Sequence, residues 1–447
     1  MEGTKDFYLN PFFHSSNFRS EFKLPSGKVF LKNVVLQNLG FSKNVATGFP
    51  FYNPITGGLG VIKSIVLTNN GVEIDGCKNC NILTGFKNVL GNPSSNHAKE
   101  DRNISADVQP RIITARKADG TFEKEGCRVS YDRIDRSALA LSQKITENAD
   151  AGIPLSYFLP VLDALGSVDT TVLQDLRIRI EYVGGDGTLT TDKDDSVAVS
   201  LTPVLKMKEI EDDKLMSQMK YKNGSTNWVT YEHDRFGIAA SGGTTIGLVN
   251  ETHVRLSGLR NKYIGRVLIT KNLVNSAATG MIKDHFVYGE GNVGSFANFK
   301  EKIQIRVNGR NLFPEGGVGG LKSSELTAMC VDTWGDYSCI PYGNEYGMGP
   351  GAYNADSNAW PMSLSVNQVG NGRRAYIGFS VQQMAQDFHI EYSRVSVAAE
   401  VAATGLLGAS GYTNLAQTAN VYYETFKQIV IKDGQVAVSY ANPGGSI

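Results

Sequence analysis

The sequence carries no excess of charge of either sign. Lys and Arg together number 44, as do Asp and Glu, so the formal net charge is zero. A neutral chain lacks the overall basic field through which many proteins wrap nucleic acid. Its weak self-repulsion is compatible with close packing against copies of the same chain.

Cysteine is also scarce, with five residues in a chain of 447. An odd count at low density argues against a secreted disulfide scaffold and favours a reducing compartment. The first 13 residues have no basic start followed by an apolar run, so we expect no signal peptide. The nearest approach to a long apolar run, residues 395–407, is broken by Glu400, so we expect no membrane span.

Glycine and aromatic residues are abundant, with 48 Gly against 14 Pro, 20 Phe and 19 Tyr. Many turn formers together with many aromatic and β-branched residues favour sheets. At about 100–200 residues per domain, the length predicts two or three domains, or two large all-β ones.

Short segments with alternating apolar and polar residues recur along the whole chain. Residues 18–24, 176–183 and 302–307 alternate most clearly, as half-buried strands do. Asp433-Gly434 lies between two such segments and predicts a hairpin. Further predicted strands are residues 29–39, 61–67, 111–116, 127–131, 137–142, 196–210, 228–231, 252–256, 264–270, 363–369, 374–379, 388–397, 425–431 and 436–440.

Two segments depart from this pattern. Residues 153–162 are apolar but contain Pro154 and Pro160, which limit them to a short helical turn or an irregular packing segment. Residues 211–220 begin acidic, end basic and lack Gly and Pro, which predicts a helix. We therefore expect an N-terminal arm at 1–17, a first β domain at 18–213, a connector helix at 214–223 and a second β domain at 224–447.

Four stretches, taken in order, resemble a known family. They are residues 18–24 with 29–31, residues 153–162 followed by 176–183, residues 303–314, and residues 388–394 followed by 421–440. In these stretches the chain is similar to the double jelly-roll major capsid proteins of tailless icosahedral double-stranded DNA viruses, of the polinton-like virus and virophage type.

The resemblance implies an all-β fold of two tandem eight-stranded jelly rolls. It implies three copies per pseudo-hexameric capsomer in an icosahedral virion shell assembled inside the host cell. Residues 71–107 and 309–361 would form outward loops, and the arm would lie inside or reach a neighbour. The implied partners are copies of the chain, neighbouring capsomers, penton and minor capsid proteins, with a membrane or genome possible beneath and no sequence-specific nucleic acid.

Cys77 and Cys80 form a CxxC motif. A zinc site needs a second cysteine pair or a nearby Cys/His set, which Cys127 and His97 could supply. A loop with free thiols is the simpler interpretation, so we predict no metal site.

Residues 316–323 approach a phosphate-binding loop, but Leu321 stands where that motif requires glycine before Lys322-Ser323. A flexible surface loop is the simpler interpretation. The histidines have no i, i+4 pair and no HExxH motif, and the chain has no GxSxG motif. The histidines are His14, His97, His233, His253, His285 and His389, of which His389 is expected to be packed or at an edge within a strand.

An acidic and aromatic stretch could instead serve a sugar-cleaving enzyme, which needs two carboxylates at a defined separation. Its residues are Asp332, Asp336 and Glu345, with Trp334 and Trp360 as stacking platforms. A contact loop is the simpler interpretation. Small basic clusters are expected to be solvated or paired, with weak genome contact as the alternative; they are Arg373, Arg374, Arg111, Arg116 and Lys117.

The sequence thus predicts a structural protein with no catalytic, cofactor or metal site. Two alternatives stay open: a β-sandwich protein that binds or cleaves glycans, and a minor capsid or spike protein.

Overall fold

The protein is described by a computed structural model. It describes residues 3–15, 18–38, 41–44, 61–84, 110–114, 128–131, 153–183, 196–199, 202–239, 249–273, 301–314, 329, 332–333, 376–395 and 417–443. Predicted strands 137–142 and 363–369 lie outside these residues.

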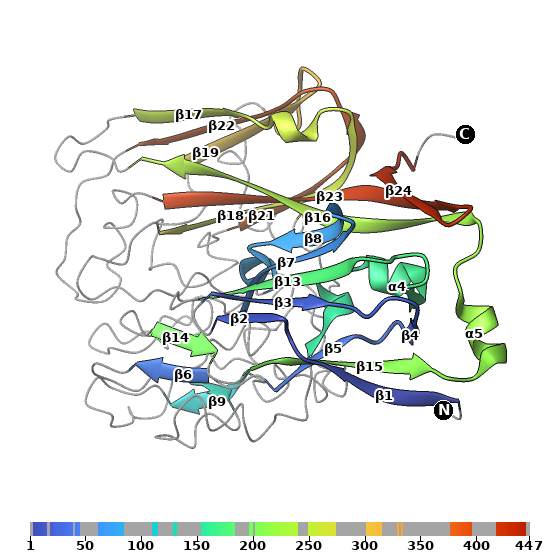
Figure 1. The fold of residues 1–447 in the computed structure, drawn as a ribbon. Helices are drawn as coiled ribbons and strands as arrows, with labels where there is room; N and C mark the ends of the chain where they lie inside the picture. The colour runs from blue at the N-terminus through green and yellow to red at the C-terminus, as the bar shows by residue number, and fades with distance from the viewer. Residues whose placement is uncertain are drawn as a thin grey trace.

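The first half of the chain forms two main antiparallel sheets (Figure 1). One contains β1 (Thr4–Leu9), β15 (Val204–Ile210), β4 (Val29–Leu31), β5 (Val35–Gln37), β11 (Ile153–Pro154) and β12 (Ser167–Asp169). The other is ordered β2 (Phe13–Ser15), β3 (Arg19–Lys23), β13 (Leu176–Tyr182), β7 (Ile62–Asn69) and β8 (Val72–Lys78). Two small pairs join β6 (Phe41–Asn44) to β14 (Ser196–Val199) and β9 (Pro110–Thr114) to β10 (Arg128–Tyr131).

The second half also forms two sheets. One is ordered β16 (Gly224–Ile238), β23 (Gln417–Lys432), β18 (Lys262–Leu273) and β21 (Tyr376–Ala385), with β24 (Gln435–Tyr440) beside β23. The other is ordered β17 (Val249–Arg255), β22 (Phe388–Val395), β19 (Glu301–Val307) and β20 (Arg310–Asn311). Helical elements of the described residues include η4 (Leu155–Tyr157), α4 (Val161–Leu165), α5 (Asp213–Met219) and η5 (Ser257–Leu259), and residues 80–84 form a further helical turn.

The same strand order occurs in both halves. We number eight strand positions in each half by their order along the chain. In the first half they are filled by β1 (position 1), β3 (2), β4 and β5 (3), β7 (4), β8 (5), β11 and β12 (6), β13 (7) and β15 (8). In the second half they are β16 to β23. Both halves then have one sheet ordered 1-8-3-6 and another ordered 2-7-4-5. The predicted all-β fold is confirmed, and each half has a strand order typical of a jelly roll, with the first and last strands as neighbours in one of two sheets.

We call residues 4–210 the first roll and residues 224–440 the second roll. Their strands form where the sequence alternates. In β13, Leu176, Ile178 and Ile180 are buried while Arg177 and Arg179 are exposed. This strand lies between β3 and β7, and its apolar face covers the core of the first roll.

Tight turns end several strands at an Asn-Gly or Asp-Gly pair. Asn70 and Gly71 have φ of 49° and 77°, Asn308 and Gly309 have 52° and 79°, and Asp433 and Gly434 have 52° and 77°. Two consecutive residues with positive φ are typical of the type I′ hairpin turn, which favours these residue types. The first two turns join strand positions four and five of their rolls, and the third confirms the hairpin predicted at Asp433-Gly434.

The expected arm at 1–17 differs in the structure, because β1 pairs with β15 along its whole length and β2 pairs with β3. The first roll therefore begins before residue 18. The connector helix is shorter than predicted: α5 ends at Met219, and Lys220 has extended backbone angles. The stretches 71–107 and 309–361 are not wholly irregular, since they contain β8, a helical turn at 80–84 and β20.

The proline-containing segment at 153–162 forms β11, η4 and the start of α4, as its composition predicts. Among the described residues, no helix has the length and apolar character needed to cross a membrane. The apolar stretch at 395–407 lies outside them after Val395.

Candidate functional site: the seam between the two rolls

The two rolls meet along one edge of each. From the first roll, β8 and α4 contact β16 of the second roll (Figure 1). The fifth strand position of the first roll thus lies against the first strand position of the second. We call this contact the seam.

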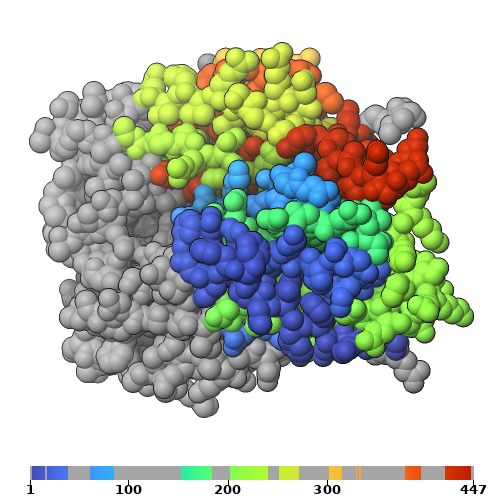
Figure 2. All heavy atoms as spheres, in the orientation of Figure 1, coloured from blue at the N-terminus to red at the C-terminus, as the bar shows by residue number. Residues whose placement is uncertain are grey.

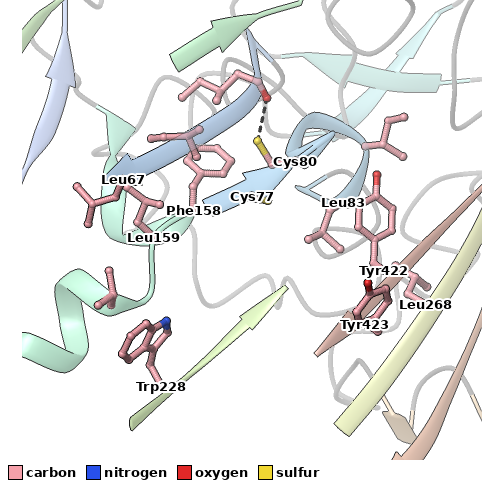
Figure 3. Close-up of a cluster of buried hydrophobic side chains, with 14 of the residues drawn as sticks. Leu67, Cys77, Cys80, Leu83, Phe158, Leu159, Trp228, Leu268, Tyr422 and Tyr423 are labelled. Carbon is pink, nitrogen blue, oxygen red and sulfur yellow. Dashed lines mark hydrogen bonds between the residues drawn. The ribbon is translucent and has the colours of Figure 1, made fainter. Parts of the chain in front are cut away.

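Apolar side chains from both rolls fill the seam (Figure 3). Trp228 of β16 is 5% exposed and points toward α4 and the Phe158-Leu159 segment. On the other side, Leu83 of the first roll faces Tyr422 of β23. The buried residues form one cluster that spans both rolls. The two rolls therefore share a hydrophobic core.

A fully buried carboxylate lies within this apolar contact. Asp75 of β8 is 0% exposed and accepts a hydrogen bond from Thr230 Oγ1 of β16 at 2.6 Å. It also accepts hydrogen bonds from the backbone N–H groups of Val161 at 3.1 Å and Gly76 at 3.0 Å. Burial raises the pKa of Asp75, and these hydrogen bonds and the charge of Lys427 oppose that rise. One carboxylate thus links β8, α4 and β16.

A β-bulge aims this carboxylate at the seam. Leu67 of β7 pairs with Asp75, but the next residue, Thr68, pairs with Glu73, so Ile74 is inserted. Ile74 and Asp75 are consequently both buried, although successive side chains of a regular strand point to opposite faces.

A second polar group crosses the seam beside the first. The Tyr422 hydroxyl donates to the backbone carbonyl of Asn79 at 2.8 Å. His233 Nε2 lies 3.0 Å from Asn420 Oδ1 and 3.3 Å from Asn79 Nδ2, and its ring centroid is 4.9 Å from that of Tyr422. Burial lowers the pKa of His233 and raises that of Tyr422, which favours the neutral form of each.

The CxxC cysteines also lie at the seam. Cys77 is in β8 and Cys80 begins the helical turn at 80–84, and both are buried free thiols. They are not in a loop, which corrects that part of the prediction. Cys80 Sγ donates to the carbonyls of Ile62 at 3.2 Å and Lys63 at 3.3 Å, and burial is the main cause of its raised pKa. Such a thiol is protonated and unreactive.

Charged side chains form a network inside the second roll. Glu424 of β23 is buried and pairs with Arg266 of β18, which also donates to the carbonyl of Thr333 at 3.1 Å. Nearby, Lys262 Nζ lies 2.8 Å from Glu232 Oε2. These pairs hold β16, β18 and β23 together, and no pattern in the sequence distinguished them from ordinary surface charges.

The remaining predicted residues that the structure describes lie apart from the seam. His14 lies 2.7 Å from Ser20 Oγ, His253 lies 3.6 Å from Glu251, and His389 pairs with Asp387 at 2.7 Å within β22 and its preceding turn. Asp332 is exposed. Of Arg111 only the backbone, in β9, is described. Those outside the described residues are His97, His285, Cys127, Cys330, Cys339, residues 316–323, Trp334, Asp336, Glu345, Trp360, Arg116, Lys117, Arg373 and Arg374.

The described residues include no group of three or more His, Cys, Asp or Glu side chains arranged to hold a metal ion. Asp75, His233 and Tyr422 have pKa shifts that favour their neutral forms, and each is hydrogen-bonded within the chain. This arrangement joins two folded units.

No protein-family model matches the sequence, and no curated protein matches it. Solved structures do match the fold. A chain in the structure of the Sputnik virophage aligns with a TM-score of 0.51 at 9% identity, covering 100% of this chain and 92% of that one. The major capsid protein of Faustovirus aligns with a TM-score of 0.50 at 10% identity, covering 96% of this chain and 90% of that one. The two-roll fold is therefore shared with viral proteins along nearly the entire chain.

Proposed function

We propose that this chain is a major capsid protein, which trimerises into pseudo-hexameric capsomers that tile an icosahedral virion shell. The observation that carries the proposal is the repeated strand order: both rolls have sheets ordered 1-8-3-6 and 2-7-4-5. Two alike units in one rigid chain give six alike units when three copies surround an axis. The shared fold with the Faustovirus major capsid protein supports the same function.

The seam supports this proposal physically. A shell subunit must hold its two rolls at a fixed angle, because a flexible joint would spoil the symmetry of the ring. A shared core with Asp75 bonded to Thr230 and Val161 supplies that rigidity. The jelly roll also limits the exposed sheet edges that would otherwise cause uncontrolled association.

Native mass spectrometry and negative-stain electron microscopy of the purified protein test the proposal. We expect trimers with a hexagonal outline. Stable monomers at high protein concentration would contradict it. A minor capsid or spike role is distinguished by copy number, since a major capsid protein dominates the protein mass of the virion. Penton and minor capsid partners, and a membrane beneath the shell, belong to the same proposal and are tested by protein and lipid analysis of purified particles.

The glycan-directed alternative gains no support from the described residues. Of its five residues, Asp332 alone lies among them, and it is exposed. A glycan array combined with a hydrolysis screen tests it directly, and binding or turnover there would reopen it.

A further inference from the structure

The strand positions that meet at the seam predict which edges would meet between two chains. Within the chain, the edge at strand position one of the second roll, β16, lies against position five of the first roll, β8. The corresponding edges that remain are β1, at position one of the first roll, and β20, at position five of the second. Figure 1 places β1 at one end of the molecule and β19, the partner of β20, toward the opposite end. They cannot meet within one chain.

The β1 side of the first roll carries an unusual surface. β1 is the edge strand of one sheet and β2 is the edge strand of the other, so residues 4–15 form both edges on this side. Large exposed apolar side chains gather here: Tyr8 is 57% exposed, Phe12 55%, Phe13 41% and Phe18 52%. Among the described residues, the two other large apolar side chains that are exposed are Val72 and Tyr440, which lie elsewhere. We call Tyr8, Phe12, Phe13 and Phe18 the N-terminal aromatic edge.

Three of these aromatic rings, those of Tyr8, Phe13 and Phe18, contact a cationic side chain of the same chain. The Arg19 guanidinium carbon lies 5.2 Å from the centre of the Phe13 ring and 5.3 Å from that of Phe18. Lys206 Nζ lies 5.6 Å from the centre of the Tyr8 ring. Figure 2 shows the N-terminal residues, in the deepest blue, on the outside of the molecule. An ordered, exposed aromatic surface is typical of a protein interface, because little conformational entropy is lost when it is covered.

We infer that the N-terminal aromatic edge binds the β19–β20 edge of the second roll in a neighbouring copy of this chain. The inference rests on the proposed function and names its interface. The facing edge suits it chemically, since Arg310 and Asn311 of β20 are both exposed, and an arginine side chain packs favourably on aromatic faces. β20 is also an edge strand of its sheet.

Repeating the seam from chain to chain gives a head-to-tail contact. Such a contact builds a closed ring when the rotation closes and an open filament when it does not. Because each chain contributes two rolls, a ring of six rolls closes with three copies of the chain. The seam and the inferred contact then alternate around the ring, one within each chain and one between chains.

The variant Phe12→Ser/Phe13→Ser/Phe18→Ser tests the inference. All three side chains are at least 41% exposed, so serine leaves the core of the first roll intact. We expect the protein concentration needed for trimer formation to rise by at least about tenfold, because aromatic residues dominate interface energies. Val72→Ser is the matched control, since Val72 is 62% exposed but lies on β8. Thermal unfolding followed by circular dichroism verifies that each variant is folded.

Lysine cross-linking of the wild-type protein locates the contact independently. Lys5 of β1 and Lys302 of β19 are both exposed and lie toward opposite ends of one chain. We expect Lys5–Lys302 links in the covalent trimer band and not in the monomer band. Links between chains that join first rolls only to first rolls would overturn the inference.

The outcomes separate the two proposals. Trimeric wild type with a dissociated triple variant supports the inference. A triple variant that is trimeric at wild-type concentrations overturns it and leaves the proposed function standing. Monomeric wild type overturns both. A flotation assay with anionic phospholipid vesicles gives one further outcome. If the wild type floats with the vesicles, and the triple variant stays trimeric but does not float, the edge binds membrane and the inference is overturned.

Discussion

Single residues at the seam carry large energetic consequences because they are buried. Asp75 is surrounded by three donors and by apolar side chains, so each donor offsets part of the cost of removing a carboxylate from water. Removing one of the three donors leaves the Asp75 carboxylate buried with one hydrogen bond fewer. The seam is therefore sensitive to substitutions that change almost no volume.

Thr230→Val tests this sensitivity, since valine keeps the shape and removes the hydroxyl donor. Thr230 is 1% exposed. We expect the free energy of unfolding to fall by about 1–3 kcal/mol, as when a buried hydrogen bond loses one partner. Urea denaturation followed by tryptophan fluorescence measures it. Thr226→Val, at a half-buried position of the same strand, is the control and should change stability by less than about 0.5 kcal/mol.

Asp75→Asn tests the titration of the same group. Burial holds the folded-state pKa of Asp75 above its ordinary value of 3.8, so the folded protein binds more protons than the unfolded one above that pH. The stability contributed by this shift is fully present below the pKa that Asp75 has in the unfolded state. It is lost as the pH rises through the pKa that Asp75 has in the folded state. From about pH 4 upward, we expect wild-type stability relative to Asp75→Asn to decline with pH.

Asp175→Asn supplies a control of opposite sign. Hydrogen bonds from Lys23 and Arg177 lower the pKa of Asp175, so its contribution is present above 3.8 and is lost as pH falls through the folded pKa. Urea denaturation across a pH series measures all three proteins. Parallel pH profiles for wild type and Asp75→Asn would show that Asp75 does not titrate differently in the folded state.

At the scale of strands and turns, the hairpins depend on backbone conformation more than on side-chain packing. Gly309 and Gly434 have φ of 79° and 77°, and a Cβ atom at either position would meet nothing within 4 Å. Alanine there would therefore be strained by its backbone alone.

We expect Gly309→Ala and Gly434→Ala each to lower the free energy of unfolding by about 1–2 kcal/mol, the cost of a left-handed conformation for a residue with a Cβ atom. Gly237→Ala is the control, because Gly237 lies in β16 with equal space and without a positive φ. It should be neutral or stabilising. Chemical denaturation measures the three variants, and an equal loss in Gly237→Ala would refute the backbone explanation.

Most strands of this fold could be predicted from alternation and turn residues, as β13 and the Asp433-Gly434 hairpin show. β1 was missed because it is an edge strand whose exposed and half-buried residues do not alternate. The seam was missed for a different reason. The bulge at Ile74 shifts the alternation of β8, and Asp75 meets Thr230 across 155 residues of sequence. Local pattern does not report such a contact.

At the scale of the whole molecule, two rolls with separate sheets behave as one body because their buried side chains form one cluster. No main sheet of the described residues mixes strands of the two rolls. Cooperation between the rolls therefore depends on side chains at the seam and not on a shared hydrogen-bond ladder. A substitution at the seam is therefore expected to affect the stability of both rolls.

Differential scanning calorimetry of the full chain tests this coupling. We expect one unfolding transition, since unfolding either roll exposes the seam residues of the other. Trp228→Ala should lower the free energy of unfolding by about 3–5 kcal/mol, because it removes a large side chain that is 5% exposed. Two well-separated transitions in the wild type would show that the rolls unfold independently.

The pairing of β1 with β15 has a consequence for synthesis. β1 begins at Thr4 and its partner ends at Ile210, so the ribosome completes almost half of the polypeptide before the two strands can join. During that interval β1 has no partner strand, and its backbone N–H and C=O groups on that edge are unpaired. An unpaired strand of this kind exposes the growing polypeptide to aggregation until its partner strand has been translated.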